Sequence, residues 1–209
     1  MRTGIQLPAE TSGYLPKQST WSSSTFGNLP IGQGVSESLL QLAGMYQAIA
    51  NNGVRITPTL VASTTVNGVT TPTPAGAQTV AMSPQTAKTL IQMLHGPIQG
   101  GDEYHRGTAP AAAITGYQVA GKTGTAQQVD EDTGEYSKTL ITSTFAGIVP
   151  ADNPKYVITI MLDNPKGDSP AGTTSCAPLF HDIAAYAMRA ADVPPSAEQA
   201  PVYDLYVAN

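Results

Sequence analysis

The spacing of apolar residues along the chain predicts helices in three places. The first begins at Ser38 and Gln41, whose side chains can each bond the other residue's backbone N–H, and ends at the Asn51-Asn52-Gly53 run. A second is expected from Ser83-Pro84 to Gly96, with its apolar residues on one face. The third is expected over residues 176–190, where apolar side chains form a broad face.

Alternating apolar and polar positions predict a sheet in the last third of the chain. Residues 119–129, 142–149 and 156–162 are interpreted as strands separated by turn-forming residues. Shorter strands are expected after residue 54, with Asn67-Gly68 as a hairpin turn. Hairpin-linked strands followed by a helix are typical of an α+β domain, so we expect an antiparallel sheet with the 176–190 helix packed on one face.

The two ends of the chain lack such patterns. Residues 1–35 are rich in Gly, Ser, Thr and Pro and are interpreted as irregular, with Trp21 and Phe26 as packing anchors. The segment "VPPSAEQAP" near the C-terminus has the composition of a linker.

Composition narrows the possible functions. The 209 residues suffice for one domain. The composition, with 41% hydrophobic and 12% charged residues, is too apolar for a disordered chain. A net charge of -5 argues against a nucleic-acid partner. A single cysteine and three scattered histidines, His95, His105 and His181, predict no disulfide, no metal site and no cofactor. No run of about 18 apolar residues is present, so any membrane anchor is expected outside this sequence.

Lys122 belongs to a stretch with two chemical interpretations. "GYQVAGKTGT" (116–125) matches the phosphate-binding pattern G-x-x-x-x-G-K-[ST], and Asp163 ends an apolar strand, as a magnesium-holding residue would. A phosphate loop, however, leaves a buried strand and opens a helix, and neither is expected around residue 122. The nucleotide-binding alternative is therefore disfavoured.

The second interpretation is the K-T-G triplet of serine acyl-transferases, carried on a strand beside a cleft. Lys122 would supply positive charge to neighbouring reactive groups and attract a carboxylate. Gly124 would leave room for a substrate backbone to lie against the strand. Of the two hydroxyls of Thr123 and Thr125, we expect only one to face the cleft directly.

Longer segments carry a resemblance to a family. "AGKTGTAQ" (120–127) resembles the third active-site motif of class B penicillin-binding proteins, the peptidoglycan D,D-transpeptidases. The other segments that are similar to this family, in the same order, are "TGIQLPAE" (3–10), "IGQGVSESLLQLAGMYQAIANNG" (31–53), "FAGIVPADNPKYVITIMLDNP" (145–165) and "APLFHDIAAYAM" (177–188). The resemblance implies part of a penicillin-binding, serine β-lactamase-like transpeptidase fold.

The sequence departs from the family at the nucleophile. The family's serine lies in an S-x-x-K motif and its second motif is S-x-N, and no serine of this sequence fits either pattern. We therefore expect residues 1–190 to be the C-terminal part of a transpeptidase domain, residues 191–209 to be a tail, and the chain alone to be inactive. It should need the missing N-terminal half of the domain, or self-associate through residues 156–162.

The resemblance also implies roles and partners. The family's serine attacks a peptidoglycan stem peptide, the acyl group passes to an amine, and β-lactams stay bound to the serine. Lys122 would then hold the proton and charge network beside the serine. Thr123, Gly124 and Thr125 would bind substrate, Thr125 also giving one oxyanion-hole N–H. The full protein is expected at the extracytoplasmic face of the bacterial membrane, anchored by an N-terminal segment. A non-catalytic interaction module on the same scaffold is the alternative.

Overall fold

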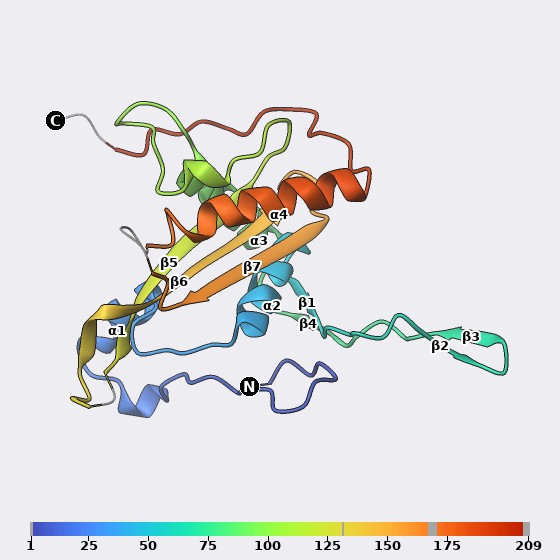
Figure 1. Ribbon diagram of the computed structural model, residues 1–209, viewed down its shortest axis with the longest axis horizontal. Coiled ribbons are helices and arrows are strands. Elements are labelled where there is room, and N and C mark those ends of the chain that lie inside the picture. The colour runs from blue at the N-terminus through green and yellow to red at the C-terminus, as the bar shows by residue number, and fades with distance from the viewer. Residues whose placement is uncertain (1, 131, 167–170, 207–209) are drawn as a thin grey trace.

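A computed structural model describes residues 2–130, 132–166 and 171–206 of the chain (Figure 1). Its α-helices are α1 (Thr25–Asn28), α2 (Leu39–Ala50), α3 (Pro84–His95) and α4 (Cys176–Ala190). Its strands are β1 (Val54–Ile56), β2 (Ser63–Val66), β3 (Val69–Pro72), β4 (Gln78–Val80), β5 (Ala120–Val129), β6 (Tyr136–Val149) and β7 (Tyr156–Asp163). The expected α+β class with an antiparallel sheet is confirmed, and the 176–190 helix has the expected bounds.

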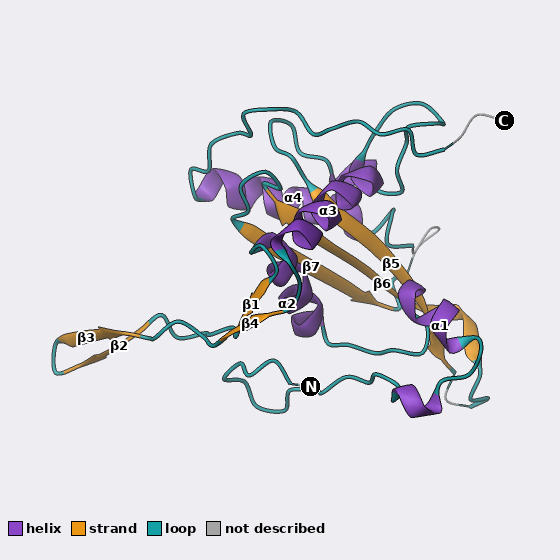
Figure 2. Ribbon diagram, turned by 180° about the vertical axis from the view of Figure 1, so that it is seen from behind, coloured by secondary structure: helices purple, strands orange, loops and turns teal. Residues whose placement is uncertain are grey.

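The main sheet has the order β5-β6-β7, and both pairings are antiparallel. β6 is therefore the central strand, and side chains that alternate along it face opposite sides of the sheet. Phe145 and Val149 pack with α4 residues in one core cluster. Ala146 and Ile148 pack with α2 residues in a second cluster. The sheet is thus covered by α4 on one face and by α2 and α3 on the other (Figure 2).

Local sequence signals explain where the helices begin. In α2, Gln41 N–H donates to Ser38 Oγ at 3.1 Å, and Ser38 N–H donates to Gln41 Oε1 at 2.7 Å, which completes the expected capping box. Ser83 Oγ accepts from Thr86 N–H at the start of α3. Cys176 is the buried first residue of α4, and burial raises the pKa of its thiol, which fits a packing role.

A long arm projects from the body between β1 and β4. β2 and β3 form its hairpin, with Asn67 at φ 51° and Gly68 at φ 82°, so both turn residues take the left-handed conformation that a two-residue turn of this kind requires. At the base of the arm, Val54 pairs with Val80. Figure 1 shows the arm extending well beyond the sheet and helices.

Two expectations about the N-terminal and sheet regions are corrected. Trp21 and Phe26 are not packing anchors within the described chain, because Trp21 is 37% exposed and Phe26 is 75% exposed. Their segment contains only short helical turns, and neither ring belongs to the two core clusters. The second strand of the sheet also starts at Tyr136 rather than 142, since it continues past a register shift opposite Gln127 and Val129.

Candidate functional site

Strand β5 carries the four residues 122–125 that the sequence singled out. Lys122 is its third residue and is exposed, with Nζ donating to the Thr123 carbonyl at 2.9 Å. In the sheet order, β5 lies at an edge, so no described strand pairs with its outer side. The cation of Lys122 therefore lies beside unpaired backbone groups that an extended ligand could bond.

The phosphate-loop interpretation is wrong. Lys122 lies inside a ten-residue strand, and the next element is the antiparallel strand β6 rather than a helix. No helix N-terminus is therefore available to hold a phosphate at this lysine. Asp163, the other apparent support, is the last residue of β7, and its carboxylate accepts a bond from the Gln128 amide of β5.

Titration with magnesium-ATP checks this conclusion. We expect no measurable heat of binding at nucleotide concentrations up to the millimolar range, because a lysine on a strand lacks the helix amides that bind the phosphates. Isothermal titration calorimetry is the measurement. A micromolar affinity that disappears in Lys122→Ala would contradict the assignment.

The two threonines lie on the same face of β5, so strand alternation does not separate their hydroxyls, which was the reason for expecting only one at the cleft. Side chains two residues apart on a strand share a face. Thr123 is directly opposite Phe145, whose ring contacts Phe180 of α4, so this face is the α4 side of the sheet. Thr125 Oγ1 accepts from Gly172 N–H at 3.3 Å, from the loop that leads into α4. Both hydroxyls can therefore contact one ligand.

The backbone around Gly124 is closely packed. A Cβ at Gly124 would collide with the Thr144 hydroxyl of β6, which could rotate away. A Cβ at Gly172 would lie 2.7 Å from the Gly124 carbonyl oxygen and 2.8 Å from that of Thr144, and neither backbone atom can move freely. Gly172 thus allows the loop before α4 to lie against the K-T-G strand. No sequence pattern marked Gly172, since its partners are distant along the chain.

His95 supports the K-T-G strand from the side of α3. It is 5% exposed, and its Nδ1–H donates to the Val119 carbonyl at 3.0 Å, one residue before β5 begins. Burial lowers the pKa of His95, while the bond to Val119 and the charge of Asp152 act in the opposite direction. His95 therefore has a structural role, and its bond to Val119 helps fix the start of β5.

The other histidines also make structural contacts. His181 Nδ1–H donates to the Ala113 carbonyl at 2.6 Å, and His105 lies between Asp102 and Asp204. Across the described ranges, no three His, Cys, Asp or Glu side chains are grouped so that they could hold a metal ion. None of the helices in the described residues has the length and apolarity needed to span a bilayer.

A separate groove of about 930 Å³ lies between the N-terminal segment and α2. Its lining includes Tyr14, Leu15, Lys17, Glu37 and Met45, and none of the K-T-G residues. Because the chemistry-bearing side chains are on β5, we assign the candidate site to β5 and not to this larger groove.

Comparison with known proteins shows the family of the chain. The family model for the penicillin-binding protein transpeptidase domain matches residues 1–185. The chain is 50% identical over 203 residues to penicillin-binding protein PbpB of Mycobacterium tuberculosis, and 29% identical over 195 residues to peptidoglycan D,D-transpeptidase FtsI of Escherichia coli. It is similar to the crystal structure of penicillin-binding protein 3 of M. tuberculosis complexed with ampicillin, with a TM-score of 0.90 and 48% identity.

The matches cover most of this chain but a smaller part of each relative. The alignment with PbpB spans 96% of this chain and 30% of the relative, and that with FtsI spans 93% and 30%. The crystal structure is matched over 99% of this chain and 46% of its own. The family model matches residues 1–185, which include every strand and most of the helices described above. The chain belongs to the penicillin-binding protein transpeptidase domain family.

Proposed function

We propose that this chain provides the C-terminal part of the active site of a D,D-transpeptidase, which cross-links peptidoglycan stem peptides through a serine acyl-enzyme. The observation that carries the proposal is the position of the K-T-G residues on an open edge strand. An extended peptide can lie along such an edge and use its backbone groups, and a β-lactam can occupy the same place. The ampicillin complex of the M. tuberculosis relative supports a β-lactam as a ligand.

Each K-T-G residue has a role in this proposal. Lys122 supplies the positive charge that keeps the serine and its neighbours in their reactive protonation states. Thr123 and Thr125 bind the carboxylate of the donor peptide or the drug, which their shared face allows. The backbone N–H of Thr125 is one oxyanion-hole donor, and the serine's own N–H is the other. The nucleophilic serine is not among these residues, since no serine of this sequence fits the S-x-x-K pattern.

We propose further that the N-terminal half of the transpeptidase domain completes the sheet beside β7. No described strand pairs with the outer edge of β7, an apolar strand of the type that pairs readily with another chain. Residues 14–31 also expose several large apolar side chains, as a surface that meets a partner does. These are Tyr14 at 61%, Leu15 at 73%, Phe26 at 75% and Ile31 at 73% exposure.

In this division, residues 1–190 belong to the catalytic domain and residues 191–209 to a tail, of which 207–209 lie outside the described residues. The complete protein would act at the extracytoplasmic face of the bacterial membrane, held there by an N-terminal anchor. Without its other half, the chain would associate with itself through β7.

Labelling with a fluorescent penicillin, followed by denaturing electrophoresis, tests the proposal. The chain alone should give no labelled band, because no serine in it has the S-x-x-K pattern. Mixing it with a separately expressed N-terminal half that carries S-x-x-K and S-x-N should label that half, and Lys122→Ala should strongly slow this labelling. The matched control is Lys155→Ala, which removes a lysine from the β6–β7 turn.

Three results would count against this function. A label on the chain alone would mean that another nucleophile exists. A correctly folded complete protein that takes no label would support the non-catalytic interaction module instead. Light scattering that shows a stable monomer at high concentration, without the other half, would mean that β7 is not a pairing edge.

A further inference from the structure

The segment after α4 folds back onto the body of the protein. Its linker-like composition predicted no such contact. Tyr117 OH donates to the Val193 carbonyl at 2.7 Å, Ser196 N–H donates to the Gly116 carbonyl at 2.9 Å, and Gln118 N–H donates to Ser196 Oγ at 3.0 Å. In Figure 1 this segment runs beside the loops that precede β5. These bonds fix its first end immediately before the K-T-G strand.

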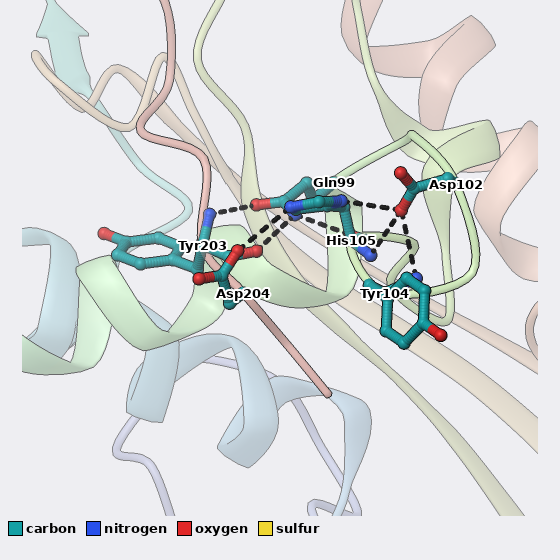
Figure 3. A network of polar contacts seen from close by, with 6 residues as sticks. All are labelled: Gln99, Asp102, Tyr104, His105, Tyr203 and Asp204. Carbon is teal, nitrogen blue, oxygen red and sulfur yellow. Dashed lines mark hydrogen bonds and ion pairs between the residues drawn. The ribbon is translucent and has the colours of Figure 1, made fainter. Parts of the chain in front are cut away.

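The second end is held by Gln99, whose side-chain amide makes the two hydrogen bonds that the backbone of a neighbouring strand would make. Its Nε2 donates to the Tyr203 carbonyl at 2.7 Å, and its Oε1 accepts from Tyr203 N–H at 2.7 Å (Figure 3). Leu205 N–H then donates to the Tyr104 carbonyl at 3.0 Å. We call residues 193–205 the strap, because both of its ends are bonded to the body.

Between its ends the strap spans a cavity. A cavity of about 250 Å³ is lined by strap residues 199–202 on one side and by His95, Tyr117 and Val119 on the other. Residues 200–202 of the strap are thus not tightly packed against the body. Their position depends on the bonds on either side, from Gln118 to the carbonyls of Glu198 and Gln199 and from Gln99 to Tyr203. Opening the strap would therefore expose to water the buried Val119, the residue directly before β5.

A histidine lies between two carboxylates at the second end. His105 Nδ1 is 2.6 Å from Asp102 Oδ1 of its own loop, and His105 Nε2 is 3.0 Å from Asp204 Oδ1 of the strap (Figure 3). Both ring nitrogens face acceptors, and only the protonated imidazole carries two N–H donors. The contact with Asp204 therefore needs the charged ring if the contact with Asp102 is kept.

We propose that the strap is a pH-dependent closure over the cavity beside Val119, just before the K-T-G strand, fastened through His105 by Asp102 of the body and Asp204 of the strap. Asp102 and Asp204 are the charged groups that contact the ring from the two elements packed against it. When the ring loses a proton, one nitrogen becomes an acceptor facing a carboxylate, and that contact turns from attractive to repulsive.

The direction of the pH effect follows from the pKa of His105 when the strap is docked. The bond to Asp102, together with the charge of Asp102 and the contact with Asp204, raises the pKa of His105 when the strap is docked, although desolvation acts against this. At pH values below the ordinary pKa of histidine, the protonated ring therefore contributes its full stabilisation of the docked strap. This stabilisation is lost as the pH rises through the raised pKa of His105 in the docked state. The closed strap is the low-pH form, and loosening is expected under mildly alkaline conditions.

Hydrogen exchange of the complete protein, corrected for the intrinsic pH dependence of exchange, tests this closure. Peptides that contain the amides of Tyr203 and Leu205 should be more protected at pH 6 than at pH 8.5. The three side chains are partly to largely exposed, so we expect a difference of about two- to fivefold, as for exposed ion pairs. Asp204→Asn should abolish the pH dependence.

Glu198→Gln is the matched control. It removes a carboxylate from the same strap, but only the backbone carbonyl of residue 198 bonds the body, to Gln118 Nε2 at 3.1 Å. It should leave the pH dependence intact. A second measurement follows the His105 ring by NMR, and the pKa of His105 should fall in Asp204→Asn. Protection that does not change with pH in the unaltered protein, or equal effects of the two variants, would overturn the proposal. Neither readout depends on transpeptidase activity.

Discussion

Lys122→Ala in the complete transpeptidase is expected to slow acylation by penicillin by roughly 10²- to 10³-fold, the usual effect of removing one well-placed electrostatic or proton-transfer group. The lysine is exposed on an edge strand, and its described contacts are with the neighbouring Thr123. Its removal should therefore leave the fold unchanged. The loss should lie in the chemical step, because in the proposed function the charge of Lys122 acts on the serine's proton and on the developing oxyanion.

The acylation rate constant, measured with a fluorescent penicillin under single-turnover conditions, separates this effect from a folding defect. Lys155→Ala is the control, since it removes the same charge from the turn between β6 and β7. It should acylate at the rate of the unaltered protein, and both variants should unfold at the same urea concentration. A Lys122→Ala rate within tenfold of the unaltered rate would remove Lys122 from the proposed machinery.

Thr125→Ala should have a smaller effect than Lys122→Ala. The substitution removes one hydroxyl but keeps the backbone N–H that we assign to the oxyanion hole, so a loss of about threefold to tenfold is expected from one hydrogen bond. An effect as large as that of Lys122→Ala would indicate that the hydroxyl also acts in the chemical step.

The sequence predicted the elements that depend on local signals. Ser38 and Gln41 are close in sequence and bond each other, so the start of α2 could be read directly. The turn at Asn67-Gly68 is similarly local, since both residues adopt positive φ. The K-T-G residues were also found from the sequence, because they are contiguous on one strand.

The features that could not be predicted from the sequence involve contacts between residues that are distant along the chain. The strap is held by Gln99 and by backbone groups of residues 193–205, and composition says nothing of where backbone groups find partners. Trp21 and Phe26 were expected to be buried because large aromatic residues usually are. Their exposure reflects a surface that the described chain does not cover by itself.

Phe180→Ala is expected to lower the free energy of unfolding by about 3–5 kcal/mol, the usual effect of deleting a buried aromatic side chain. Phe180 is 0% exposed on α4, and its ring centroid is 4.6 Å from that of Phe145 on the central strand. Its loss would open a cavity between helix and sheet. Tyr186→Ala on the same helix is the control, since Tyr186 is 68% exposed and should change stability by less than about 1 kcal/mol. Urea unfolding of the complete domain measures both.

The cavity expected in Phe180→Ala also predicts that the effect of a substitution at Gly147 depends on residue 180. A Cβ at Gly147 would lie 2.6 Å from the Phe180 ring, so Gly147→Ala alone should destabilise the domain by about 1–3 kcal/mol through overpacking. In the Phe180→Ala background the same methyl group would enter the cavity, and its effect should become small or favourable. A double-mutant cycle measures this coupling directly. Strictly additive effects would mean that Phe180 and Gly147 do not share the contact that fixes α4 against the sheet carrying Lys122.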